Sequence, residues 1–164
     1  MKALGIDPGL ANTGWAIVSR SSRGAFDMID SGIIKTNGED TEPKRMQEIY
    51  SSVVEVIHKH QLDIVAVERV FFNNNPSSCL TTAGVCYICS LAAEQLGLPT
   101  DFFTPQQVKA ACGCGGKADK RTVSSFVFKL TGTKVMNWHV ADAGATAIAG
   151  LLKTRAVNVY NGKE

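Results

Sequence analysis

LGIDPGLANTGWAIV, residues 4–18, is the stretch of this chain that decides how it folds. Leu4 to Asp7 and Gly14 to Val18 are apolar runs of strand length, and Pro8-Gly9 between them favours a turn. The stretch therefore predicts two strands joined by a short connection. Asp7 interrupts the apolar run just before the turn, so we expect its carboxylate at a strand end, where it can hold a ligand.

Beyond this pair, the hydrophobic periodicity alternates between strand and helix. In chain order it predicts a strand over Phe26 to Thr36 with a bulge or twist at Ser31-Gly32, a helix from Pro43, a strand over Ile64 to Val67 and a helix from Asn75-Pro76 to Gly97. A strand over Thr100 to Phe103 follows, and then helices from Pro105, near Lys120 to Leu130 and from about Asn137 to Leu152. The first three strands predict an antiparallel meander. The continuous apolar run at Ile64 to Val67 indicates a buried strand parallel to its neighbour. We expect an α/β fold with a mixed sheet and helices on both faces.

Composition favours a single domain over residues 1–164. The chain has 164 residues, 45% of them hydrophobic, which is enough for one core and short for two. It has no run of about eighteen apolar residues and starts directly with a strand pattern, so we expect a cytoplasmic protein that has no membrane partner. The five cysteines are an odd number, which favours reduced thiols. A net charge of +2 does not by itself identify a nucleic-acid binder.

Four side chains that are far apart in the sequence are candidate ligands of one metal site: Asp7, Glu68, His139 and Asp142. Glu68 follows the apolar run Ile64 to Val67 in the way that Asp7 follows the first strand. His139 and Asp142 are three residues apart at the start of a predicted helix, so both can face one side. Carboxylate oxygens with one imidazole suit Mg²⁺ or Mn²⁺ bound at a phosphodiester.

Four motifs, in this order, resemble the RuvC family of Holliday junction resolvases. They are GIDPGLANTG (residues 5–14), VERVF (67–71), QVK (107–109) and HVADA (139–143), and they span nearly the whole chain. The resemblance implies an RNase H-like fold with a mixed five-stranded sheet, three strands antiparallel and two parallel. It also implies a homodimer and a metal-dependent endonuclease that nicks two opposing strands of a four-way DNA junction in recombination and repair.

The resemblance assigns roles to the candidate ligands. Asp7 would bridge two ions about 4 Å apart, Glu68 would complete the shell of one ion, and His139 with Asp142 that of the other. Lys109 and Lys120 match positions near the scissile phosphate and are expected to stabilise its charge. Many relatives carry an aspartate where this chain has His139, and an imidazole there should favour Mn²⁺ over Mg²⁺. It is also the group best suited to deprotonate water near neutral pH.

Basic and aromatic residues near these motifs are candidate DNA contacts. A basic cluster around the glycine-rich segment Cys112 to Gly116 can bind backbone phosphates, and it consists of Lys109, Lys117, Lys120 and Arg121. After Glu68 come two aromatic rings and a polar run, from which we expect contacts to DNA by Phe71, Phe72 and Asn73. Phe71 matches an aromatic that stacks on bases in relatives, whereas core burial is the stronger alternative for Phe72.

The next predicted helix departs from the family pattern. Many relatives carry a lysine and an arginine where this chain has Thr81 and Cys86, so some DNA or dimer contacts are expected to differ. The same helix is the dimer contact in relatives, which implicates its apolar residues, among them Tyr87. The cysteine pairs Cys86/Cys89 and Cys112/Cys114 leave a structural zinc as an alternative to buried thiols. The sequence does not show whether a RuvA and RuvB branch-migration complex is a partner.

Two other classes of function stay open at this point. Residues 5–14 also resemble the first phosphate loop of actin-like ATPases and sugar kinases, but those folds need a second nucleotide-binding subdomain, which this chain is too short to supply. The other alternative is a junction-binding protein with little or no cleavage. The histidine at position 139 and the loss of basic residues from the helix that carries Thr81 and Cys86 would be consistent with such a protein. A purely structural alternative for Trp138-His139 is that they cap the last helix.

Overall fold

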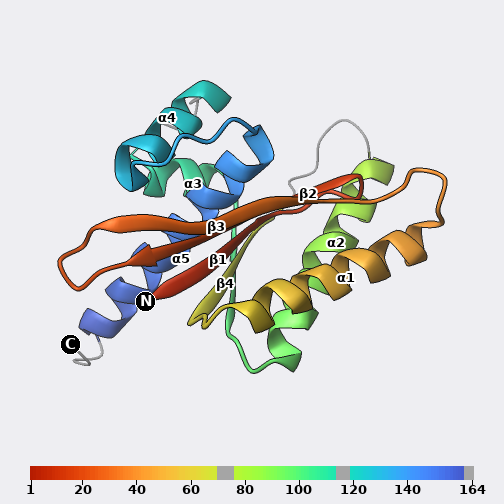
Figure 1. The fold of residues 1–164 in the computed structure, drawn as a ribbon, viewed down its shortest axis with the longest axis horizontal. Helices are drawn as coiled ribbons and strands as arrows, with labels where there is room; N and C mark the ends of the chain where they lie inside the picture. Colours follow the sequence, from red (N-terminus) through yellow and green to blue (C-terminus); the bar gives the residue numbers. More distant parts are fainter. Residues whose placement is uncertain (70–75, 114–118, 161–164) are drawn as a thin grey trace.

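The computed structural model describes residues 1–69, 76–113 and 119–160, and its centre is a five-stranded mixed sheet (Figure 1). The strands lie in the order β3-β2-β1-β4-β5. Their bounds are Lys2–Asp7 (β1), Asn12–Arg20 (β2), Phe26–Lys35 (β3), Ile64–Glu68 (β4) and Thr100–Phe103 (β5). Pairing is antiparallel for β1 with β2 and β2 with β3, and parallel for β1 with β4 and β4 with β5. The predicted meander and the predicted parallel strand are both confirmed.

Helices cover both faces of the sheet, as predicted. Their bounds are Glu42–Lys59 (α1), Pro76–Gln95 (α2), Pro105–Ala111 (α3), Lys120–Thr131 (α4) and Trp138–Tyr160 (α5). One core lies between the sheet and α1 with α2, and the other between the sheet and α3, α4 and α5 (Figure 1). No helix among the described residues combines the length and the apolarity that crossing a membrane requires.

The strands supply both cores by alternation. Ala3 of β1 belongs to the core under α3, α4 and α5, whereas Leu4 and Ile6 belong to the core under α1 and α2. In β4, Ala66 belongs to the core under α3, α4 and α5, and Val65 belongs to the core under α1 and α2. All five side chains have 0% exposure, so the strands that carry Asp7 and Glu68 are held by apolar packing on both faces.

Glycines allow α5 to lie almost directly on the sheet. A Cβ atom at Gly5 of β1 would be 2.0 Å from the carbonyl oxygen of Ala143, and one at Gly14 of β2 would be 2.4 Å from that of His139. Both distances are far below van der Waals contact, so α5 can keep this position only over residues without a side chain. Because Gly14 pairs with Asp7, the first turn of α5 is fixed above the end of β1.

The bulge in the β2–β3 pair is not where we predicted it. The register shifts between Ile17 and Val18 of β2, whereas the sequence suggested an irregularity at Ser31-Gly32 of β3. Gly32 has a different role, because a Cβ atom there would be 2.8 Å from the indole ring of Trp15. The glycine makes room for a cross-strand aromatic ring rather than for a backbone irregularity.

The last helix is longer than predicted. It ends at Tyr160, whereas the polar run Lys153-Thr154-Arg155 suggested an end near Leu152. Polar residues alone do not stop a helix, and the chain has neither proline nor glycine between Leu152 and Tyr160 to break the backbone pattern.

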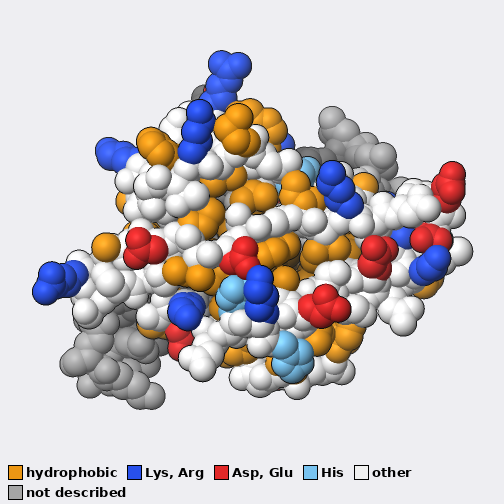
Figure 2. Space-filling view, in the orientation of Figure 1, with side chains coloured by type: hydrophobic (Ala, Val, Ile, Leu, Met, Phe, Trp, Pro, Cys, Tyr) orange, Lys and Arg blue, Asp and Glu red, His pale blue; other side chains and the backbone are white. Residues whose placement is uncertain are grey.

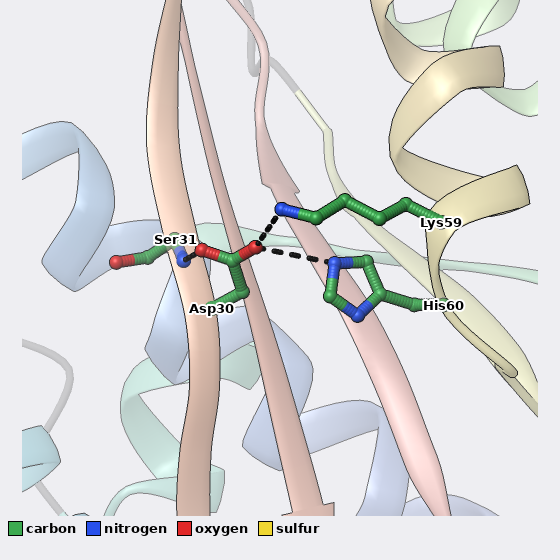
Figure 3. A network of polar contacts seen from close by, with 4 residues as sticks. All are labelled: Asp30, Ser31, Lys59 and His60. Carbon is green, nitrogen blue, oxygen red and sulfur yellow. Dashed lines mark hydrogen bonds and ion pairs between the residues drawn. The ribbon is translucent and has the colours of Figure 1, made fainter.

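A polar contact ties the edge strand β3 to the end of α1 (Figure 3). Asp30 Oδ2 accepts a hydrogen bond from Lys59 Nζ at 3.0 Å and lies 3.2 Å from His60 Nε2, while Asp30 Oδ1 accepts one from the backbone N–H of Ser31 at 2.9 Å. The bond from Lys59 is the largest of the causes that hold the pKa of Asp30 below its usual value. Lys59 is exposed, so the contact adds little to stability and mainly orients the strand end.

We predict that Gly5→Ala destabilises the chain by about 3 kcal/mol or more, because the new methyl group would collide with the backbone of α5. Urea denaturation would measure the change in the free energy of unfolding. Gly38→Ala is the matched control, since nothing lies within 4 Å of a Cβ atom there. An equal, small effect at both positions would contradict the close contact between α5 and β1.

Candidate active site

Asp7 and Glu68 come together because they end two neighbouring parallel strands. Ile6 of β1 pairs with Val67 of β4, so the next residue of each strand is the acidic one. The carboxyl ends of parallel strands lie at the same edge of a sheet, which is where α/β folds place their ligands. The register therefore places the two acidic residues at neighbouring strand ends.

His139 and Asp142 enter from the first turns of α5. The side chain of Asn137 accepts the backbone N–H of His139 at 2.9 Å and so caps the helix start. The structural alternative in which Trp138-His139 form the cap is therefore wrong. The imidazole is turned to the sheet instead, where its Nδ1 lies 2.7 Å from Asp7 Oδ2.

The contact with Asp7 orients the imidazole ring. An ionised carboxylate can only accept, so the hydrogen between the two atoms belongs to Nδ1 of His139. In the neutral ring the lone pair is then on Nε2, which is available to a metal or to the proton of a water. The sequence did not predict this contact between His139 and Asp7.

Burial and neighbouring negative charge raise the proton affinity of the carboxyls in this site. Burial, followed by the charges of Asp7 and Asp142, raises the pKa of Glu68 to about 8. Burial and the charge of Asp7 raise the pKa of Asp142 to about 6. Burial also raises the pKa of Asp7, although the hydrogen bond from His139 opposes that rise. Negative charge is thus concentrated here and only partly compensated.

Two lysines supply part of the compensation. Lys120 lowers the pKa of all three carboxyls, and Lys109 lowers that of Glu68 and Asp142. They border, with both of these acids, a cavity of about 400 Å³ whose lining consists of Glu68, Pro105, Val108, Lys109, Asp119, Lys120, Val123 and Asp142. The site therefore offers acidic groups for a cation and basic groups for an anion in one hollow.

Helix caps place these lysines. Thr104 and Gln107 form a reciprocal capping box that starts α3, which carries Lys109. Asp119 accepts the backbone N–H of Thr122 at 2.8 Å, which starts α4 at Lys120. Asp119 is not among the residues that the sequence analysis singled out. The Asp-x-x-Thr spacing before an amphipathic run was the signal for its capping role.

The donor set fits a hard divalent cation. Oxygen ligands from carboxylates are what Mg²⁺ and Mn²⁺ bind, and three crowded acidic groups with raised pKa values gain from such a charge. Within residues 1–69, 76–113 and 119–160, however, no three acidic, histidine or cysteine side chains are already arranged as one metal shell. One oxygen of Asp7, Oδ2, accepts a hydrogen bond from His139 in this arrangement.

Only some of the predicted DNA contacts lie in the part of the chain that the structure describes. Arg121 is exposed on α4, where Figure 2 shows Lys and Arg side chains, and its charge acts on Asp119. Lys109 and Lys120 line the cavity described above. Four further predicted contacts lie outside the described residues, namely Phe71, Phe72, Asn73 and Lys117.

The cysteines in the described residues do not support a zinc site. Cys86 and Cys89 are buried in the core under α1 and α2, whereas Cys112 is buried in the core on the opposite face of the sheet. The Sγ atom of Cys86 lies 3.4 Å from the backbone oxygen of Glu68, to which it donates. This residue, which departs from the family pattern, thus supports the end of β4.

Comparisons with known proteins agree with this geometry. A family model described as crossover junction endodeoxyribonuclease RuvC matches residues 3–150. The crossover junction endodeoxyribonuclease RuvC of Saccharopolyspora erythraea is 36% identical over 149 residues, which are 91% of this chain and 75% of that protein. The protein of the same name from Pelotomaculum thermopropionicum is 37% identical over 90% of this chain and 91% of its own length.

The fold is similar to that of a solved relative. T. thermophilus RuvC in complex with a Holliday junction substrate superposes with a TM-score of 0.85 and 26% identity, over 95% of this chain and 96% of that one. The predicted RNase H-like fold is therefore confirmed. Sequence, fold and site agree that the chain belongs to the RuvC family of crossover junction endodeoxyribonucleases.

Proposed function

We propose that the chain acts as one nuclease domain that resolves Holliday junctions by paired, metal-dependent nicks in opposing strands during recombination and repair. One observation carries this proposal. Asp7 raises the pKa of both Glu68 and Asp142, and these two acids line one cavity with Lys109 and Lys120, so the site can hold a cation and a phosphate together. Family membership supplies the substrate class, since a solved relative is in complex with a Holliday junction substrate.

Phosphodiester hydrolysis needs charge neutralisation, a deprotonated water and a stabilised leaving oxygen. We propose that Asp7, Glu68, Asp142 and His139 hold Mg²⁺ or Mn²⁺, with two ions per site. When bound, such ions neutralise phosphate charge and lower the pKa of water. The raised pKa values of the three acids support this assignment, because a bound cation stabilises the ionised form that burial, and for Glu68 and Asp142 also neighbouring negative charge, disfavours.

The chain's own groups divide the remaining work. His139, oriented by Asp7 through Nδ1, presents the lone pair of Nε2, which would either bind a cation or take a proton from water, but not both at once. Lys109 and Lys120 border the same cavity as Glu68 and Asp142, so their charges can stabilise the extra negative charge of the phosphorane-like transition state. The products would carry 5′ phosphate and 3′ hydroxyl ends.

Paired nicks on a two-fold junction call for a two-fold dimer, and we propose that α2 forms its interface. Leu80, Tyr87 and Leu91 are 71%, 61% and 51% exposed, and their spacing places them along one side of the helix. Exposed apolar side chains in such a stripe suit a second copy of the chain. A RuvA and RuvB partner and a cytoplasmic location stay predictions.

Asp7→Asn should abolish cleavage and keep junction binding, because the substitution removes a metal ligand and leaves the basic groups in place. We expect the rate to fall by about a thousandfold or more, measured with a labelled four-way junction in Mg²⁺ or Mn²⁺. Asp27→Asn, an exposed site on β3, is the matched control and should cut normally.

The same assay separates the alternatives. A shifted band without nicks in the parent chain would favour a junction-binding protein, and nucleotide hydrolysis without DNA would favour an ATPase or sugar kinase. Cleavage that survives in Asp7→Asn would remove Asp7 from the catalytic set.

Glu68→Gln should stabilise the chain at pH 8 when divalent cations are chelated. The folded-state pKa of Glu68 is raised from 4.5 to about 8, so the folded chain keeps a proton that the unfolded chain releases. The stability that this group contributes is therefore lost as pH rises from 4.5 to about 8, and the loss is complete above pH 8. Removing the carboxylate should restore about 3 kcal/mol at pH 8.

Thermal melts in chelator would measure this effect. The melting temperatures of parent and variant should converge below pH 4.5, where Glu68 is protonated in both states. Added Mn²⁺ should raise the melting temperature of the parent more than that of the variant. Equal melts at pH 8 would contradict the raised pKa.

Tyr87→Asp should shift the chain toward monomers, because it puts a charge in the middle of the α2 stripe. We expect the dimer dissociation constant to rise by at least about tenfold, measured by sedimentation velocity. Phe128→Asp on α4 is the control, since Phe128 is 50% exposed and lies outside the stripe. A dimer that tolerates Tyr87→Asp and dissociates with Phe128→Asp would move the interface to α4.

A further inference from the structure

A second depression borders the site on the other side of His139. It has a volume of about 550 Å³ and lies where the β1–β2 connection meets the first turns of α1 and α2. Figure 1 shows these three segments at one end of the molecule. The lining consists of Gly9, Leu10, Ala11, Asn12, Glu42, Arg45, Ser77, Ser78, Thr81, Thr82 and His139. We call it the α1–α2 groove.

Arg45 is the permanently charged basic residue among the described residues that line this groove. Its Nε atom donates to Thr36 Oγ1 at 2.8 Å, and that hydroxyl donates to the backbone oxygen of Leu10 at 2.6 Å. The backbone N–H of Thr36 donates to the oxygen of Ala11 at 3.3 Å. The guanidinium is thus tied to the connection that directly follows Asp7.

The anchoring leaves most of the guanidinium's binding capacity available. A guanidinium has five N–H donors, and Thr36 takes the one on Nε. Within the described part of the chain, no acceptor is found for the two terminal nitrogens of Arg45. A planar fork of this kind, held at one corner, is well suited to two oxygens of a phosphodiester.

The groove and the catalytic cavity meet at the start of α5. His139 lines the groove, and Asp142, one turn further along the helix, lines the cavity with Lys109 and Lys120. A strand whose scissile phosphate lies over the cavity therefore passes His139 before it enters the groove. The serine and threonine side chains of α2 make the groove polar without adding charge.

We propose that the α1–α2 groove binds the backbone of the cleaved strand next to the scissile phosphate, with Arg45 as its phosphate ligand. The proposal rests on the proposed function and adds a contact that the sequence motifs do not contain. It explains why a half-buried arginine on α1 is anchored to the loop after Asp7 rather than to an acidic neighbour.

One acidic group lines the same groove and should act in the opposite direction. Glu42 Oε1 accepts a hydrogen bond from Thr81 Oγ1 at 3.3 Å, which keeps the carboxylate beside α2. A phosphate in the groove would be repelled by this charge. Substitutions of Arg45 and Glu42 should therefore change the affinity for a phosphate in opposite directions.

The test uses an Asp7→Asn background, so that binding to a labelled four-way junction can be titrated without cleavage. Adding Arg45→Gln should weaken binding by about tenfold and reduce the slope of log affinity against log salt by about one unit. Adding Glu42→Gln should strengthen binding severalfold. With Asp7 intact, Arg45→Gln should raise the half-saturating junction concentration and leave the maximal cleavage rate nearly unchanged.

Lys44→Gln is the matched control, because Lys44 precedes Arg45 on the same helix but is exposed and paired with Asp40 outside the groove. Its effect on the salt slope should be clearly smaller. Thermal melts of each variant identify a folding defect. Arg45→Lys retains the positive charge, so if Arg45 contacts the strand through its charge, this variant should keep most of the salt slope.

The outcomes are distinguishable. If Arg45→Gln and Lys44→Gln have the same salt slope as the parent, or Glu42→Gln fails to strengthen binding, the groove does not hold the strand and the nuclease proposal is unaffected. If the parent neither binds nor cuts a junction, the proposed function fails and takes this inference with it.

Discussion

The whole site depends on one packing constraint, the contact of α5 with the glycines of β1 and β2. With a side chain at Gly5 or Gly14, the backbone atoms of Ala143 and His139 could not lie where they do. The alanines of α5 complete this contact, since Ala143, Ala145 and Ala147 are fully buried. As a result, the imidazole and a carboxylate carried by a helix are brought to the end of a strand that lies more than a hundred residues earlier in the chain.

This arrangement is electrostatically unfavourable on its own and is maintained by the apolar packing around it. Leu4, Ile6, Val65 and Val67 have no exposed surface and fix the two strands whose ends carry Asp7 and Glu68. Burial is the largest cause of the raised pKa of each carboxyl in the site. The folding energy of the sheet therefore sustains a concentration of negative charge that only a cation can neutralise fully.

The sequence predicts most of the fold and the acidic part of the site, for identifiable reasons. Strand periodicity and the apolar run before Glu68 are local signals, and a parallel register then brings Glu68 beside Asp7. The contact between His139 and Asp7 could not be predicted, because it depends on how closely α5 lies on the sheet. The role of Gly32 could not be predicted for a related reason. This glycine makes room for the Trp15 ring across the strand pair, and such a tertiary contact leaves no local pattern in the sequence.

His139 changes the charge balance of the site as well as its donor atoms. An aspartate at this position would add a fourth carboxylate beside Asp7, Glu68 and Asp142, with Lys109 and Lys120 as the opposing charges in the cavity. The imidazole instead donates to Asp7 and acts as an internal partner for it. A cation must compete with that hydrogen bond for Asp7 Oδ2, and it meets one negative charge fewer than in relatives with an aspartate. The lost charge and the hydrogen bond oppose any divalent cation equally, whereas the imidazole nitrogen is a ligand that Mn²⁺ accepts more readily than Mg²⁺.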